Sequence, residues 1–247
     1  MSDDVMTLSR RDALRGAFTG LGVLAATAAM PTGLLDAPDA LAASPDASAS
    51  SLTPDQALAR LARGNRRFVR NDLNHPRRAG PRRAALAEGQ APYAVVLGCA
   101  DSRVPPEVIY DEGLGNLFVV RIAGNTVTDP YALGSVEYGS VVLGASAIVV
   151  LGHEGCGAVK AAIDVAENGT QLPGAIGAFV APIVPIARQL LPVTPKDEIV
   201  QAVTLANIRA AVATLRQTEL LTGLVDEDRL AIVGGEYRLR SGEVLAV

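Results

Sequence analysis

Residues 95–103 read VVLGCADSR, and residues 148–157 read IVVLGHEGCG. Each stretch opens with a short run of aliphatic residues, which has the length of a fully buried strand. Polar residues follow each run directly. Those whose side chains can take part in chemistry are Cys99, Asp101, Arg103, His153 and Cys156. Parallel strands all end at the same edge of a sheet, where open α/β sheets place their ligands. If the two strands are neighbours, their polar residues converge at that edge.

Similar apolar runs occur elsewhere in the chain, and we predict strands at residues 93–98, 117–121, 147–152 and 230–234. Segments long enough for helices separate them, at residues 129–143, 157–167 and 195–218. This alternation predicts an α/β fold with a mostly parallel central sheet flanked by helices. At the end of the chain, Ser241 and Gly242 lie between residues 237–239 and 244–247, which indicates a hairpin.

An N-terminal helical arm is predicted to begin after Thr53, because Thr53 can cap a helix, Pro54 suits its first position and Gln56 completes a capping box. Nine arginines lie between Arg60 and Arg83. Such a segment could bind nucleic acid or anionic lipid, or it could be a solvated helix face that forms salt bridges with a partner subunit. We favour the second interpretation, because aromatic residues are not interleaved with the arginines and the net charge of the chain is −4. No nucleic-acid partner is therefore expected.

The composition sets limits on the class of protein. Of the 247 residues, 49% are hydrophobic and 19% are charged, which excludes a disordered chain and supplies a sizeable core. Only two cysteines and two histidines are present, so a framework of several disulfides is impossible. Any metal site must use Cys99, Cys156, His75, His153 and the carboxylates.

The first 42 residues have the organisation of a targeting segment. Arg10 and Arg11 form a twin-arginine pair, residues 16–30 carry no charge, and residues 40–42 read ALA, the small-x-small pattern of a cleavage site. The uncharged stretch is too short for a spanning helix of about 20 residues. We therefore predict a signal segment at 1–42, a linker at 43–52 and one domain at 53–247. The protein would be exported to the periplasm, the cell envelope or the medium, without stable membrane insertion. The alternative is an N-terminal extension of a cytoplasmic protein.

The converging side chains predict a zinc site. Two thiolates, an imidazole and a carboxylate, from Cys99, Cys156, His153 and Asp101, form a good ligand set for zinc. Three alternatives are a Cys99–Cys156 disulfide, two buried free cysteines and a closed structural zinc site. Neither the disulfide nor the free cysteines would explain why His153 lies three residues before Cys156 and Asp101 two after Cys99. We therefore favour zinc.

The paired motif, residues 99–104 (CADSRV) with His153-x-x-Cys156-Gly157, resembles the signature of the β-class carbonic anhydrases. The similarity includes residues 64–68 (GNRRF), 118–125 (FVVRIAGN), Glu137 with Tyr138, and the final Val233-Gly234 with Tyr237 and Gly242. It covers the chain from about residue 53 to its end, so the predicted signal segment lies outside it.

This resemblance implies an enzyme that reversibly hydrates CO2 to bicarbonate and a proton, that is, a carbonate dehydratase and a lyase. It implies one Zn²⁺ per chain, held permanently by Cys99, His153 and Cys156. Asp101 would alternate between the metal and the guanidinium of Arg103, which can bind the carboxylate through two hydrogen bonds. When Asp101 is on Arg103, it would orient a zinc hydroxide toward CO2.

By the same resemblance, the substrate pocket would be formed by Gln90, Phe118, Ala123, Tyr138 and the backbone of Gly157. Gln90 would act across a subunit interface, so a homodimer or a multiple of dimers is implied. Two other functions stay open: a hydrolase of carbon disulfide or carbonyl sulfide, and a catalytically silent zinc protein used for assembly or bicarbonate sensing.

Overall fold

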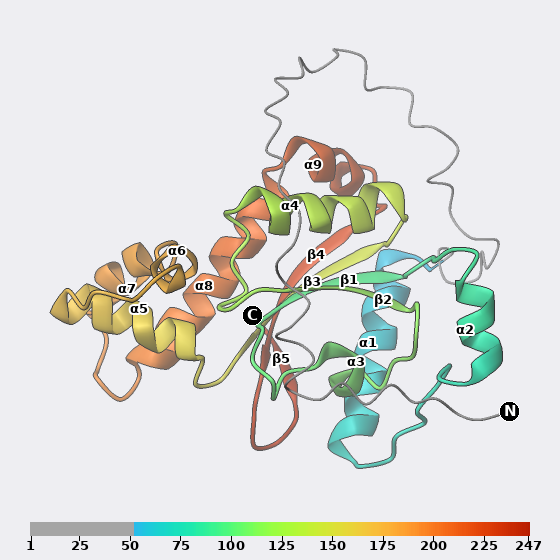
Figure 1. Cartoon of the computed structure of the whole chain (residues 1–247), viewed down its shortest axis with the longest axis horizontal. Coiled ribbons are helices and arrows are strands. Elements are labelled where there is room, and N and C mark those ends of the chain that lie inside the picture. Colours follow the sequence, from blue (N-terminus) through green and yellow to red (C-terminus); the bar gives the residue numbers. More distant parts are fainter. Residues whose placement is uncertain (1–51) are drawn as a thin grey trace, which may run out of the picture. The chain divides into compact units, whose positions relative to one another are not determined.

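The computed structural model describes residues 52–247 (Figure 1). The predicted signal segment at 1–42 and the linker, apart from its last residue, lie outside the described residues. Within residues 52–247, no helix combines the length and the apolar character needed to cross a membrane.

A five-stranded sheet forms the centre of the domain. Its strands are β1 (Ala94–Gly98), β2 (Leu117–Arg121), β3 (Ala147–His153), β4 (Ala231–Tyr237) and β5 (Val244–Ala246). Their order is β2-β1-β3-β4-β5, and only β5 runs antiparallel to its neighbour. The predicted α/β fold with a mostly parallel sheet is confirmed. The predicted hairpin is present, and Tyr237 of its first arm pairs with Val244, but this arm is the end of β4, which continues unbroken from Ala231 to Tyr237, and not a separate strand at 237–239.

Helices connect the strands. They are α1 (Pro54–Val69), α2 (Gly80–Leu86), α3 (Pro106–Ile109), α4 (Pro130–Glu137), the π-helical turn η2 (Tyr138–Val142), α5 (Gly157–Asn168), α6 (Ile176–Val180), α7 (Val184–Leu190), α8 (Ile199–Arg216) and α9 (Glu219–Asp226). The helix expected at 129–143 is divided between α4 and η2. Gly139 lies in η2, and a Cβ there would come within 2.6 Å of Val95 Cγ2, so the glycine allows the turn to approach β1 closely.

The helices cover both faces of the sheet, as Figure 1 shows. On one face, Val95 and Leu97 of β1 pack with apolar residues of α4, α8 and α9. On the other face, Ala94 and Val96 pack with residues of α1 and α3. Helices cover both faces and alternate side chains of a strand point to opposite faces, so β1 and β3 carry no polar side chain before His153 at the end of β3, and every residue of both is buried.

The N-terminal arm begins as its sequence predicts. The Thr53 hydroxyl accepts a hydrogen bond from the Gln56 amide, the Gln56 side chain accepts one from the Thr53 amide, and Pro54 occupies the first turn. The apolar side of α1 then packs on the sheet of the same chain through Ala57 and Leu61.

Arg60 and Arg67 of α1 bind acidic residues of their own chain. Arg67 contacts Asp111 at 2.6 Å, and Arg60 contacts Glu112 through two hydrogen bonds of 2.8 Å. Glu112 is only 2% exposed and also accepts hydrogen bonds from the Tyr93 hydroxyl at 2.8 Å and from Asn116 Nδ2 at 2.6 Å. This network ties α1 to the segment before β2.

We expect Glu112→Ala to lower the free energy of unfolding by about 3–5 kcal/mol, because it leaves Arg60 and the Tyr93 hydroxyl without their acceptor. Urea unfolding at matched protein concentration measures the loss. Glu227→Ala is the control, because the Glu227–Arg229 pair is well exposed and is expected to contribute about 0–1 kcal/mol. Equal stabilities for the two variants would contradict a stabilising role for the buried network.

Candidate metal centre

Two cysteines and a histidine meet at the carboxyl edge of the sheet. Cys99 directly follows β1, His153 is the last residue of β3, and Cys156 is the N-cap of α5. The sequence predicted that the polar residues after these two strands would converge if the strands were neighbours, and β1 does pair directly with β3. The chain leaves β1 for β2 on one side, while β3 lies on the other, so the cluster occupies the topological switch point of the sheet.

The three side chains form a compact set of donor atoms. The two Sγ atoms and an imidazole nitrogen all lie within 4.8 Å of one another, and all three residues are buried. The two sulfur atoms are 4.0 Å apart, and both cysteines are free thiols. The disulfide considered above is therefore not formed in this structure.

The imidazole of His153 has the hydrogen bonding of a metal ligand. Its Nδ1 lies 3.0 Å from the carbonyl oxygen of Glu154, an arrangement in which Nδ1 carries the proton and donates it. Its Nε2 is buried and has no hydrogen-bond partner among the described residues. A buried polar atom without a partner is costly unless something else satisfies it. A metal ion bound by Nε2 and the two sulfurs would do so, and this ligand set suits zinc.

The surroundings of Cys99 favour the charged form that binds metal. The pKa of the Cys99 thiol is lowered, chiefly because Cys156 donates a hydrogen bond to it and also because backbone N–H groups donate to it. One of these donors is the Gly124 amide, 3.4 Å from Cys99 Sγ. Cys156 lies at the N-terminus of α5, and the pKa of its thiol is raised, chiefly by its hydrogen bond to Cys99 and by burial, while the amides of Ala158 and Val159 oppose this shift in part.

Asp101 lies beside the three ligands and binds Arg103. Its two carboxylate oxygens accept hydrogen bonds from Arg103 Nε at 2.9 Å and Nη2 at 2.7 Å, and the Arg103 amide donates a third. The pKa of Asp101 is held well below its ordinary value, mainly by the Arg103 side chain. Asp101 Oδ2 lies 3.9 Å from His153 Nε2, so the carboxylate is next to the centre without belonging to the compact donor set.

Arg121 is a site residue that the sequence interpretation did not assign. It ends β2, and its guanidinium donates hydrogen bonds to the backbone carbonyls of Cys99 and Asp101. One side chain therefore fixes the loop that carries both a ligand and the gating candidate. The sequence could have indicated it, since Arg121 is a charged residue at the end of a predicted strand whose carboxyl end lies at the same edge.

The structure brings together only some of the proposed pocket residues. Ala123 precedes Gly124, whose amide contacts Cys99, and Gly157 follows Cys156, so both adjoin the centre. Phe118 pairs in register with Val95, four residues before Cys99, which is about 13 Å along the strand. Tyr138 packs against Phe118, with ring centroids 6.0 Å apart. Within one chain, Phe118 and Tyr138 therefore do not lie beside the Cys99–His153–Cys156 group.

Gln90 lies at the other end of the sheet. It precedes β1, whose five residues span about 16 Å, whereas Cys99 follows β1. Gln90 is exposed and borders a surface hollow of about 500 Å³ between α2 and residues 114–115. Within one chain, Gln90 cannot approach the cysteines.

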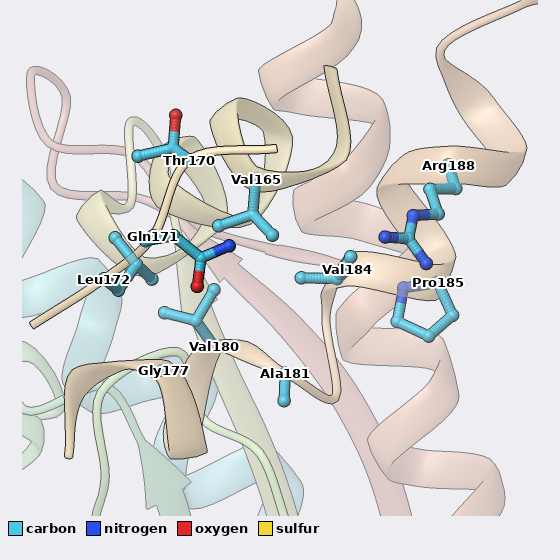
Figure 2. Close-up of a pocket in the computed structure, with 10 residues that line it drawn as sticks. All are labelled: Val165, Thr170, Gln171, Leu172, Gly177, Val180, Ala181, Val184, Pro185 and Arg188. Atoms are coloured by element: carbon cyan, nitrogen blue, oxygen red, sulfur yellow. The ribbon is translucent and has the colours of Figure 1, made fainter. Parts of the chain in front are cut away.

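A second surface hollow, of about 390 Å³, lies among α5, α6 and α7 (Figure 2). Val165, Val180 and Val184 form much of its apolar wall, and Arg188 lies at its rim. None of the residues proposed above for the metal site or the substrate pocket lines this hollow.

Comparisons with known proteins agree with the geometry. A family model described as carbonic anhydrase matches residues 94–244. Carbonic anhydrase 2 of Mycobacterium tuberculosis is 42% identical over 197 residues, which is 78% of this chain and 92% of that protein. The carbonic anhydrase of Mycolicibacterium smegmatis is 39% identical over 193 residues, or 77% and 92% of the two chains.

Solved structures show the same fold. A tetrameric β-carbonic anhydrase from Sordaria macrospora superposes with a TM-score of 0.61 at 26% identity, covering 68% of this chain and 87% of that one. The Coccomyxa β-carbonic anhydrase in complex with acetazolamide has a TM-score of 0.59 at 25% identity, with coverages of 66% and 75%. Zinc is the cofactor of these enzymes, and the Cys99–His153–Cys156 group fits it. The chain belongs to the β-class carbonic anhydrase family.

Proposed function

We propose that this chain interconverts CO2 and bicarbonate at a zinc ion held by Cys99, His153 and Cys156, and that Asp101 and Arg103 keep the fourth ligand position open. The observation that carries the proposal is the bidentate Asp101–Arg103 pair directly beside a buried Cys-His-Cys group. A closed structural zinc site would need four protein ligands, whereas catalysis needs an open position.

Zinc bound there would lower the pKa of a water molecule from about 15.7 to about 7 and so supply the nucleophile. The residues of the chain do the rest. Arg103 holds both oxygens of Asp101, which keeps the carboxylate ionised and away from the ligand position. Asp101, so held, can accept a hydrogen bond from the nucleophile and orient its lone pair toward the carbon of CO2. Arg121 holds the backbone of the same loop in place.

We also propose that the active unit is a homodimer or a multiple of dimers. In one chain, Gln90 lies at the opposite end of β1 from Cys99, and Phe118 lies beside Val95, well before Cys99. If these residues contact substrate, the copies that reach the metal site of one chain must come from a second subunit. The similar β-carbonic anhydrase from Sordaria macrospora is tetrameric, which supports an oligomer.

Stopped-flow CO2 hydration, combined with zinc analysis of the purified protein, tests the proposed function. We expect one zinc per chain and rapid, reversible hydration. Turnover of carbon disulfide or carbonyl sulfide without CO2 hydration would favour the other hydrolases. Bound zinc without any turnover would favour a silent zinc protein.

The proposed export is tested by the mass of the protein outside the cytoplasm. Arg10, Arg11 and the sequence at 40–42 support cleavage after Ala42, so we expect the exported protein to begin near residue 43. Intact mass spectrometry of the periplasmic and secreted fractions measures this. Protein found only in the cytoplasm, still beginning at Met1, would contradict export.

A further inference from the structure

Asn207 links the long helix α8 to the loop that contacts Cys99. Its side chain is 4% exposed, and its Nδ2 donates a hydrogen bond of 2.8 Å to the carbonyl oxygen of Gly124. The amide of the same Gly124 donates to Cys99 Sγ at 3.4 Å. Asn207 is therefore two hydrogen bonds away from a proposed zinc ligand.

Gly124 has no side chain that could hold it in place, and it could not easily carry one. Its φ of +81° is favourable for glycine and strained for other residues. A Cβ at this position would lie 2.8 Å from Ile183 Cδ1 and 3.1 Å from Ala158 Cβ. The direction of the Gly124 amide thus depends on packing and on hydrogen bonds made by its own backbone. Among those hydrogen bonds, the one that Asn207 donates to the Gly124 carbonyl comes from outside the loop that contains Gly124.

An amide at position 207 also needs a reason, because the neighbouring buried positions of α8 are mostly apolar. Val203, Ile208 and Ala211 are all buried in the same helix. Burying an amide costs free energy unless it is hydrogen-bonded, so an apolar residue would fill this position at lower cost if packing were its only role. The bond to Gly124 gives the amide its role.

We propose that Asn207 is a positioning residue, which aims the Gly124 amide at Cys99 Sγ and thereby raises the affinity of the site for zinc. An N–H group that donates to a thiolate stabilises its negative charge, and such charge-assisted bonds are stronger than neutral ones. Groups that orient metal ligands typically change metal affinity about 10–100-fold when they are removed. This inference rests on the metal site of the proposed function, but it concerns affinity and not turnover.

The test compares zinc dissociation constants, measured by competition with a chromophoric chelator, for the wild type, Asn207→Leu and Asn207→Ala. We expect both variants to bind zinc about 10–100-fold more weakly than the wild type. We also expect the sulfur-to-metal charge-transfer band of the Co²⁺-loaded protein to shift, because one thiolate loses a hydrogen bond. Circular dichroism and thermal unfolding show whether each variant is folded.

Thr204→Val is the matched control. Thr204 lies one turn earlier on α8 and is also buried, and within residues 52–247 its hydroxyl bonds to Val200 O of the same helix alone, at 2.8 Å. This variant loses a buried hydrogen bond without touching the loop, so it should keep wild-type zinc affinity and the wild-type Co²⁺ band. If the Asn207 variants bind zinc as the wild type does, or lose no more affinity than Thr204→Val, the positioning role is wrong. If the wild type itself binds no zinc, the proposed function fails instead.

Should neither Asn207 variant fold, the wild-type protein loaded with ¹¹³Cd decides the matter. A hydrogen bond from an amide to a metal-bound sulfur transmits a scalar coupling between the cadmium nucleus and the amide proton. We expect this coupling at Gly124, and its absence would overturn the proposal.

Discussion

Cys156→Ser is expected to empty the metal site and abolish CO2 hydration. A serine hydroxyl stays protonated near neutral pH and is a poor replacement for the thiolate that zinc prefers. Cys156 supplies one of the two sulfurs of the buried donor set, so its loss leaves only Cys99 and His153 of that set. Zinc content, measured by atomic emission on the dialysed protein, should fall well below one per chain.

The matched control for this variant is His75→Asn. His75 is the only histidine outside the centre, it is exposed, and its φ of 45° is one that asparagine tolerates. We expect this variant to keep its zinc and its activity. A Cys156→Ser protein with a full complement of zinc would show that Cys156 is not a ligand.

Arg103→Ala is expected to retain zinc but to lose activity by at least about 100-fold at neutral pH. Arg103 binds both oxygens of Asp101, whose carboxylate lies only 3.9 Å from His153 Nε2. Without the guanidinium, only the backbone amide of residue 103, among the described residues, still donates to Asp101 Oδ1, so Oδ2 loses the partner that holds it away from the ligand position and fixes its orientation. Stopped-flow measurement of kcat/KM, together with zinc analysis, separates this loss of positioning from a loss of metal.

Arg229→Ala provides the comparison, because Arg229 also pairs with an acidic residue two positions earlier, Glu227, but on the exposed surface. We expect Arg229→Ala to have wild-type activity. Near-normal CO2 hydration by Arg103→Ala would mean that the Asp101 pair is only structural and that the open position arises in another way.

Several features of this protein follow from short stretches of sequence. Thr53, Pro54 and Gln56 specify the start of α1, because capping depends on residues three apart in the chain. The apolar runs of β1 and β3 specify buried parallel strands. A parallel strand places the residue that follows it at the carboxyl edge, so Cys99 and His153 could be assigned to one site before their distance was known. The Asp101–Arg103 pair spans only two residues and is equally local.

Other features depend on distances that no local pattern contains. The division of the predicted 129–143 helix into α4 and η2 reflects the contact of Gly139 with Val95. The length of β1 separates Gln90 from Cys99, and the parallel register that places Phe118 beside Val95 separates Phe118 from Cys99, although all three lie within 30 residues of one another in the sequence.

The residue pattern alone was therefore enough to predict the type of fold, the candidate metal-binding set and the local Asp101–Arg103 pair, since each arises from residues that are close along the chain or follow a strand. The contacts that hold these candidate ligands in place were not predictable in this way. Arg121 reaches Cys99 from 22 residues away, and Asn207 reaches Gly124 from 83 residues away. The physical reason is that a hydrogen bond between distant segments depends on how helices and strands pack, and packing is decided by the whole core.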